Sequence, residues 1–218
     1  VVGLQESRQK REGISQGANY ISLASKCTQG GTHGCEIWVA SNIAVGSKAG
    51  KDVFVAKADV SVMHASPRLL IIRVNTAVSA FYVASVHAPH SKATDDPTSW
   101  WHDAACTVAK YTKPSCPLLL CLDANTRSPL MPSEAFGVHG ATIQTPFTSA
   151  FEDFAISCKV WCPSTFEDYC HDDSAHGTYH WSESEEPVRI DFLAFSGNVQ
   201  VKRGSVSTIH VDLHVERV

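Results

Sequence analysis

The chain has 218 residues, of which 44% are hydrophobic and 18% charged, and its formal net charge is −4 at pH 7. These values are ordinary for a globular domain, and a chain of this length can bury a core that needs no disulfide for stability. The negative net charge excludes a positive electrostatic potential over the whole surface. A nucleic-acid partner would therefore have to bind to a local basic patch or through bound cations. No apolar stretch approaches the ~20 residues that a membrane span needs, so we expect no membrane partner.

Strand signals dominate the chain. Runs rich in Val, Ile, Leu and Phe predict strands, and several of these runs alternate apolar and polar residues. The run at 117–122 is continuously apolar, which is typical of a strand that is buried on both faces. In chain order, the predicted strands lie at 36–45, 68–75, 80–86, 117–122, 190–195 and 206–211.

Two helices are predicted between these strands. Asp96-Pro97 supplies a capping carboxylate followed by a proline in the first turn. Thr145-Pro146 opens the second helix, and apolar residues recur at helical spacing after both starts. Strands and helices interleave with no linker, repeat or low-complexity tract, so residues 1–218 are predicted to form one α/β domain.

Both ends of the chain lie inside apolar runs. It begins at Val1 without a methionine and ends at Val218 without a polar tail. We therefore expect the natural polypeptide to extend in both directions.

Eight cysteines are more than usual for this length. An even number is compatible with a disulfide framework, but several of the cysteines lie inside apolar patterns, where a free thiol acts as a small hydrophobe. Reduced thiols inside a cell are the favoured interpretation. The run Cys158-x3-Cys162-x7-Cys170-His171 matches no regular zinc module, so scattered buried thiols are favoured over a zinc site.

An acidic or imidazole residue stands at the polar end of four strand-like runs: Glu6, His87, Asp123 and Asp191. A residue placed there is held rigidly while it faces solvent at the edge of a sheet. Glu6 offers the oxygen ligand that Mg²⁺ prefers, and the neighbouring Arg8 can anchor a phosphate or pair with Glu6. His87 can stabilise charge on a phosphate, or it is an ordinary loop histidine.

Asp123 and Asn125 are spaced i, i+2 at the end of the most apolar strand, and a period of two places both side chains on one side. Together they can hold an attacking water and a phosphoryl oxygen. Taken alone, the pair is better interpreted as an Asx turn that closes the strand. Asp191 has apolar neighbours, where a carboxylate is costly unless it is paired, either with a histidine that it orients or with Arg189 in a structural ion pair.

The order of these motifs resembles that of the endonuclease/exonuclease/phosphatase superfamily, which includes deoxyribonuclease I-like and apurinic/apyrimidinic endonucleases. The resemblance is strongest to the endonuclease domains of non-LTR retrotransposons, and it covers residues 4–212. It rests on Gln5-Glu6, Ser85-Val86-His87-Ala88-Pro89, Asp123-Ala124-Asn125 and Arg189-Ile190-Asp191. Supporting similarities are His90-Ser91 followed by Trp100-Trp101, then Pro163-Ser164-Thr165-Phe166 and Gly177-Thr178-Tyr179.

The resemblance implies a four-layer α/β/β/α sandwich of the deoxyribonuclease I-like type, truncated here at both ends. It implies that Glu6 binds Mg²⁺, with Mn²⁺ as a possible substitute, and that His87 contacts the substrate phosphate. It implies that Asp123 positions the attacking water with Asn125 as its partner, and that Asp191 orients a catalytic histidine. Arg8, Asn125 and His87 are the predicted substrate-binding residues.

The chain departs from the family pattern at two places. Leu122 stands where the family usually has glycine, and its side chain is expected to crowd the approach of a phosphate. The family also ends in an Asp-His pair. We expect this pair just beyond Val218, which leaves the fragment without its general base; the alternative is that Asp212 and His214 replace it.

These residues indicate a magnesium-dependent phosphodiesterase, and the resemblance implies that it nicks target DNA. The resemblance implies that it is part of a longer intracellular polypeptide, located in the nucleus, that carries a reverse transcriptase. Surface loops at 126–140 and 172–187 are predicted to contact the partner. Two alternatives stay open: a phosphoesterase of the same fold that acts on lipid, inositol phosphate or RNA, and a decayed copy that binds nucleic acid without turnover.

Overall fold

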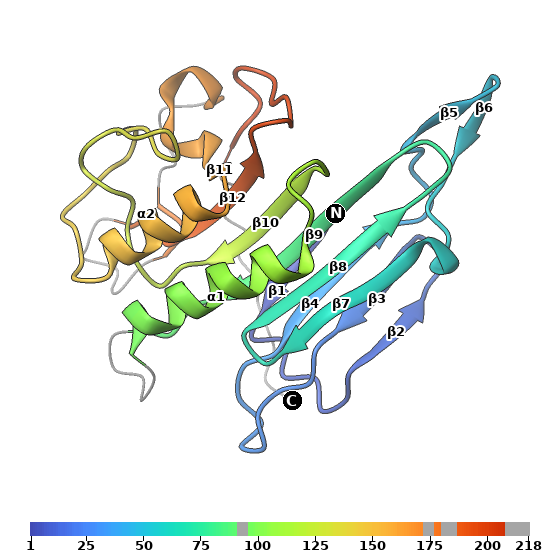
Figure 1. Ribbon diagram of the computed structural model, residues 1–218, viewed down its shortest axis with the longest axis horizontal. Coiled ribbons are helices and arrows are strands. Elements are labelled where there is room, and N and C mark those ends of the chain that lie inside the picture. Colours follow the sequence, from blue (N-terminus) through green and yellow to red (C-terminus); the bar gives the residue numbers. More distant parts are fainter. Residues whose placement is uncertain (91–95, 172–176, 180–186, 208–218) are drawn as a thin grey trace.

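Two β-sheets and a projecting hairpin form the framework of the computed structural model, which describes residues 1–90, 96–171, 177–179 and 187–207 (Figure 1). The six-stranded sheet has the order β11 (Val160–Trp161), β12 (Asp191–Ser196), β10 (Leu118–Asp123), β9 (Ala80–His87), β8 (Leu69–Asn75) and β7 (Val60–Ser66). The four-stranded sheet has the order β1 (Val2–Gln5), β4 (Cys35–Ala40), β3 (Tyr20–Ala24) and β2 (Gly13–Gln16). The hairpin pairs β5 (Gly46–Lys48) with β6 (Lys51–Val53).

The apolar runs predict most of the six-stranded sheet correctly. β10 is buried on both faces, as its continuous apolar run predicts: Leu120 and Leu122 pack on the helical side, and Leu119 packs toward the other sheet. The run predicted at 36–45 is shorter than expected, because β4 ends at Ala40. Of the run predicted at 206–211, Val206 forms an isolated bridge with Cys170, and residues 208–211 lie outside the described part of the chain.

Both predicted helices are present and lie side by side against one face of the six-stranded sheet, as Figure 1 shows. They are α1 (Pro97–Tyr111) and α2 (Thr148–Ser157). The cap of α1 is the predicted one, because the Asp96 carboxylate accepts hydrogen bonds from the backbone N–H groups of Thr98 and Ser99. Three short 3-10 helices complete the elements: η1 (Lys57–Asp59), η2 (Pro163–Thr165) and η3 (Glu167–Tyr169).

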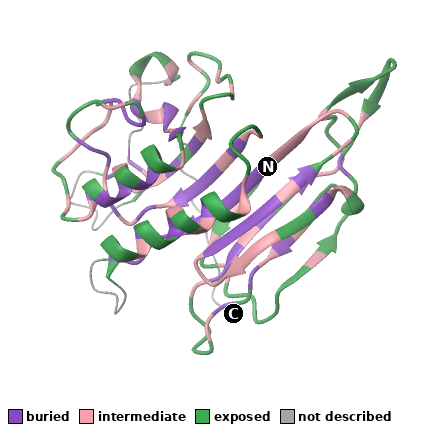
Figure 2. Ribbon diagram, viewed as in Figure 1, coloured by how far each residue is buried: buried purple, intermediate pink, exposed green. Residues whose placement is uncertain are grey.

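The hydrophobic core consists of two clusters, one on each face of the six-stranded sheet. The first joins the sheet to the helices through large aromatic residues that include Trp101, Phe151 and Phe192. The second fills the space between the two sheets with aliphatic residues such as Ile37, Leu70 and Ile72. In Figure 2, β8, β9 and β10 are mostly buried, whereas α1 and α2 carry both buried and exposed residues. The chain is thus a mixed α/β structure, whereas the full four-layer sandwich remains a prediction.

All eight cysteines are free, in agreement with the expectation of reduced thiols. Cys158, Cys162 and Cys170 form no zinc site in the described structure. The apolar helical pattern around Cys106 suggests a buried thiol, but Cys106 is exposed on α1. In the described part of the chain, no helix has the length and hydropathy of a membrane span.

Candidate active site

Strand register brings three of the predicted residues to one edge of the six-stranded sheet. β10 runs parallel to β9, and Asp123 aligns with His87. β10 runs antiparallel to β12, and Asp123 aligns with Asp191 on its other side. The end of β10 therefore places one carboxyl group between an imidazole and a second carboxyl group.

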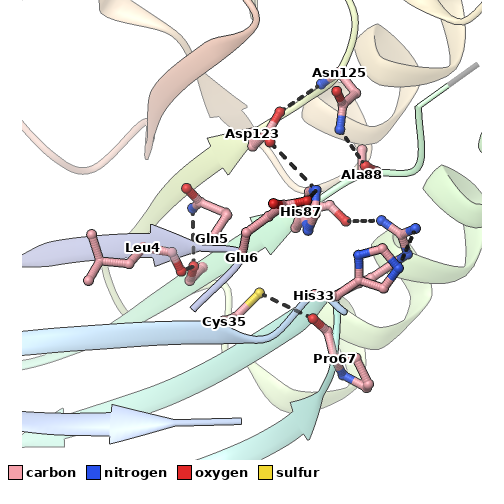
Figure 3. A network of polar contacts seen from close by, with 12 residues as sticks. Leu4, Gln5, Glu6, His33, Cys35, Pro67, His87, Ala88, Asp123 and Asn125 are labelled. Carbon is pink, nitrogen blue, oxygen red and sulfur yellow. Dashed lines mark hydrogen bonds and ion pairs between the residues drawn. The ribbon is translucent and has the colours of Figure 1, made fainter. Parts of the chain in front are cut away.

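Glu6 comes from the other sheet and reaches this edge through a set of polar contacts between the sheets. The amide Nε2 of Gln5 donates to Ser85 Oγ and to the carbonyl oxygen of Cys121, both at 3.1 Å, and Ser85 Oγ donates to the Leu4 carbonyl at 2.9 Å. These contacts, which we call the Gln5–Ser85 clasp, hold the end of β1 against β9 and β10 (Figure 3). The backbone then turns at Glu6, which has a φ of 53°.

The approach of β1 to β10 depends on a glycine. A Cβ atom at Gly3 would lie 2.3 Å from the Cβ of Cys121, which is closer than real Cβ contacts. The backbone of β1 can thus cross β10 only because position 3 has no side chain.

Burial and neighbouring charges shift the protonation of the central groups. The imidazole Nε2 of His87 lies 3.9 Å from Glu6 Oε1 and 3.6 Å from Asp123 Oδ2. Burial, with the nearby Arg68 guanidinium, lowers the pKa of His87 to about 4, so the ring is neutral at pH 7. Burial, with the charge of Asp191, raises the pKa of Asp123 to about 7. Burial also raises the pKa of Asp191.

Asp123 and Asn125 form a turn and also face the site. The backbone N–H of Asn125 donates to Asp123 Oδ1 at 3.2 Å, which is the Asx turn considered from the sequence. Asn125 has a φ of 47°, so the chain has left the strand and the two side chains do not follow strand alternation. The side-chain Nδ2 of Asn125 donates to the Ala88 carbonyl at 2.8 Å and so ties the β9 and β10 ends together.

Asp191 is held from its backbone side by Thr178. The Thr178 hydroxyl oxygen accepts hydrogen bonds from the backbone N–H groups of Asp191 and Ile190, at 3.0 and 3.1 Å. No ion pair joins Arg189 to Asp191 in the described part of the chain, and the guanidinium Nη1 of Arg189 donates to the carbonyl oxygens of Ser164 and His139. Among the described residues no ion pair joins Asp191 to a histidine, and Asp212 and His214 lie outside them, so the orienting role stays a prediction.

Two residues at the site were not predicted from the sequence. Arg68 stands at the start of β8, which is antiparallel to β9, so its guanidinium Nη1 reaches the His87 carbonyl at 3.3 Å. His33 lies in the loop between β3 and β4, and its Nε2 accepts from Arg68 Nη2 at 3.2 Å. Arg68 shows the same signal as the other motifs, a polar residue at the end of an apolar run, whereas His33 carries no periodic signal.

Leu122 and Arg8 complete the predicted set. Leu122 is 3% exposed and packs in the helix-side core, so its side chain points away from the site, contrary to the expectation that it crowds a phosphate. The reason is strand alternation, which sends Leu122 and its neighbour Asp123 to opposite sides of β10. Arg8 is exposed and its Nη2 donates to Glu6 Oε2 at 3.3 Å, which is one of its two predicted contacts.

The residues present fit a bound divalent cation. The negative charges of Asp191 and Glu6 both raise the pKa of Asp123, and the nearby Arg68 guanidinium offsets only part of this effect. Ligand atoms of Glu6, His33 and His87 lie within 4.8 Å of one another. A divalent cation at this edge would relieve the repulsion and find oxygen ligands in place.

No family description and no curated protein sequence matches the chain. Its fold matches solved structures. The endonuclease domain of TRAS1, a telomere-specific non-LTR retrotransposon, is 12% identical with a TM-score of 0.52, over 81% of this chain and 66% of that chain. An AP endonuclease from Archaeoglobus fulgidus is 13% identical with a TM-score of 0.56, over 89% and 75%. The catalytic domain of APE2 from Xenopus laevis is 11% identical with a TM-score of 0.53, over 89% and 73%.

The chain therefore has the endonuclease/exonuclease/phosphatase fold, the fold of metal-dependent phosphodiesterases. A non-LTR retrotransposon endonuclease domain is among the structures that share it, at low sequence identity, and the chain spans 66% of the length of that domain. The predicted resemblance is thus confirmed at the level of the fold.

Proposed function

We propose that the chain is a magnesium-dependent phosphodiesterase and that its substrate is DNA, which it nicks. The observation that carries the proposal is the meeting of four side chains at one sheet edge: Glu6 just after β1, His87 and Asp123 at the ends of β9 and β10, and Asp191 at the start of β12. Burial and the charge of Asp191 raise the pKa of Asp123 despite the nearby Arg68, and a carboxyl pair held in this way costs free energy that a purely structural role does not explain.

The protonation of Asp123 suits proton transfer at neutral pH. A carboxyl group with a pKa of about 7 is half ionised near pH 7 and can accept a proton from an attacking water. The neutral imidazole of His87 can donate one N–H to a phosphate oxygen, and burial keeps that ring in one place. Asn125 holds the loop after β9 through Ala88, so it fixes the spacing of the two strand ends.

Glu6 is the residue proposed to hold Mg²⁺, with Asp123 and Asp191 facing it across the site; Mn²⁺ can replace it. When bound, the ion supplies positive charge that stabilises a phosphate and its leaving oxygen. The exposed guanidinium of Arg8 forms an ion pair with Glu6 at the surface, and such pairs contribute little free energy. Arg8 can therefore leave Glu6 and turn toward a phosphate.

The DNA substrate and the setting are proposed from the shared fold. The structures with this fold include a retrotransposon endonuclease domain and an AP endonuclease, and both are endonucleases by their names. We propose accordingly that the chain is part of a longer nuclear polypeptide with a reverse transcriptase, in which the nick primes DNA synthesis. The net charge of −4 gives little general attraction to DNA, so the cation and local arginines have to supply it.

The test is nicking of supercoiled plasmid by the chain in the presence of Mg²⁺. Asp123→Asn keeps the shape of the side chain and removes its basicity, and we expect nicking to fall by roughly 10²–10⁴-fold. Asp103→Asn, an exposed position on α1, is the matched control and should nick as the wild type does. Equal nicking by the wild type and Asp123→Asn would contradict the proposal. Hydrolysis of a small phosphodiester without nicking would move the substrate away from DNA.

A further inference from the structure

A second set of donors lies at the same edge and differs from an all-oxygen magnesium site. Two histidines, His33 and His87, approach Glu6 so that one ligand atom of each lies within 4.8 Å of the others. The two imidazole rings are 5.3 Å apart between centroids and meet edge to face at 69°. Figure 3 shows the Glu6 carboxylate beside His87, with the His33 ring next to them and in contact with a guanidinium group.

The backbone holds Glu6 and His33 in fixed relation. The N–H of Ser7 donates to the Gly34 carbonyl at 3.1 Å, and the N–H of Arg8 donates to the His33 carbonyl at 3.0 Å. The N–H of Gly34 in turn donates to the Pro67 carbonyl at 2.8 Å. His33 has a φ of 64°, a conformation that costs free energy for a residue with a side chain and persists only where surrounding contacts impose it. These bonds hold His33 at the site from both sides.

The contact with Arg68 shows which form of His33 is present. A guanidinium can only donate, so Nε2 of His33 accepts and carries a lone pair that already faces a cation. A metal ion at this nitrogen would take the place of that guanidinium group. Arg68 would keep its hydrogen bond to the His87 carbonyl.

We propose that Glu6, His33 and His87 form a site for a first-row transition-metal dication, which binds there more tightly than Mg²⁺. Imidazole nitrogen suits Co²⁺, Zn²⁺ and related ions, whereas Mg²⁺ prefers oxygen ligands and retains several waters. Two imidazoles and one carboxylate therefore favour the transition ion. The inference deepens the proposed function, because it assigns a different ion class and one further ligand, His33, to the same edge.

Co²⁺ titration of the apo chain, followed by visible absorption, tests the site without any nuclease assay. We expect the wild type to bind one Co²⁺ at this site, with a dissociation constant at least about tenfold below that for Mg²⁺ measured by competition. His33→Asn and Glu6→Gln should each weaken Co²⁺ binding by about tenfold or more and change the absorption bands. Arg68→Gln should tighten it, because a competing cation is removed.

The matched control is His102→Ala on the exposed face of α1. His102 lies 3.8 Å from Cys106 and offers the rival nitrogen–sulfur pair for Co²⁺, so this variant should leave the site's affinity unchanged. An unchanged Co²⁺ affinity and spectrum in His33→Asn overturns the inference, even if Mg²⁺-dependent nicking is intact. Co²⁺ binding through His33 in a chain that never nicks DNA supports the inference and overturns the proposed function.

Discussion

The two sheets deliver their side chains to the site in different ways. The six-stranded sheet places His87, Asp123 and Asp191 by register, because neighbouring strand ends are locked to one another by ladder hydrogen bonds. The four-stranded sheet places Glu6 and His33 just beyond strand ends, at residues with positive φ. Register-held residues move only if the sheet breaks. Glu6, in contrast, depends on how the two sheets are held together, and that dependence can be tested.

The largest expected effect comes from separating the sheets at Gly3. In Gly3→Ala the new Cβ would lie 2.3 Å from the Cβ of Cys121, so we expect the free energy of unfolding to fall by about 3 kcal/mol. Urea unfolding measures the change. Gly13→Ala in β2 is the matched control, because a Cβ there meets nothing within 4 Å. Adding Cys121→Gly to Gly3→Ala should recover part of the loss, and no recovery would mean that the clash is not the cause.

Because their pKa values are shifted in opposite ways, His87 and Asp123 should make the free energy of unfolding depend on pH in opposite directions. The folded pKa of His87, about 4, is below its ordinary value, so this group makes unfolding harder as pH rises from about 4 to 6.5. The folded pKa of Asp123, about 7, is above its ordinary value, so this group makes unfolding easier as pH rises from about 4 to 7. In the wild type the two contributions largely cancel.

When one of the two residues is replaced, the pH dependence of the unfolding free energy that is due to the other residue should become measurable. Asp123→Asn should gain roughly 3 kcal/mol of stability from pH 4 to 6.5, and His87→Asn should lose roughly 4 kcal/mol from pH 4 to 7. Urea midpoints at several pH values in the absence of metal give both slopes. Slopes of the same sign in the two variants would show that the two groups do not have the opposed shifts described here.

The smallest expected effect comes from loosening the Gln5–Ser85 clasp. Gln5→Ala removes two hydrogen bonds and leaves the Cys121 carbonyl without this donor, so we expect a loss of about 1–2 kcal/mol in the free energy of unfolding. Gln16→Ala, exposed at the end of β2, should change little. Because Glu6 follows Gln5 directly, metal binding should weaken in Gln5→Ala even where the chain is fully folded. Full metal affinity in that variant would show that the clasp does not position Glu6.

The same difference between the sheets explains what the sequence could predict. Asp123 follows a continuously apolar run, so the sequence predicts both its strand and its position at the sheet edge. The turn at Asn125 was readable only as an alternative, because Asx turns and strand continuation use the same residues. His33 follows no apolar run, and backbone hydrogen bonds that His33 and Gly34 accept from Arg8 and Ser7 hold it at the site, so no local sequence pattern predicts its position. The prediction that the Leu122 side chain crowds a phosphate is wrong, because strand alternation turns this side chain into the core on the helical side.

The buried Arg189 has a consequence for the surface beside the site. Its guanidinium donates to the carbonyl oxygens of His139 and Ser164, so it links the residues before β12 to the long irregular stretch 124–147 at His139. A ligand that arrives at this surface meets a loop whose shape is already set. The loop loses its conformational entropy when the chain folds, so ligand binding does not have to order it. Binding at this surface should therefore resemble the docking of two rigid bodies.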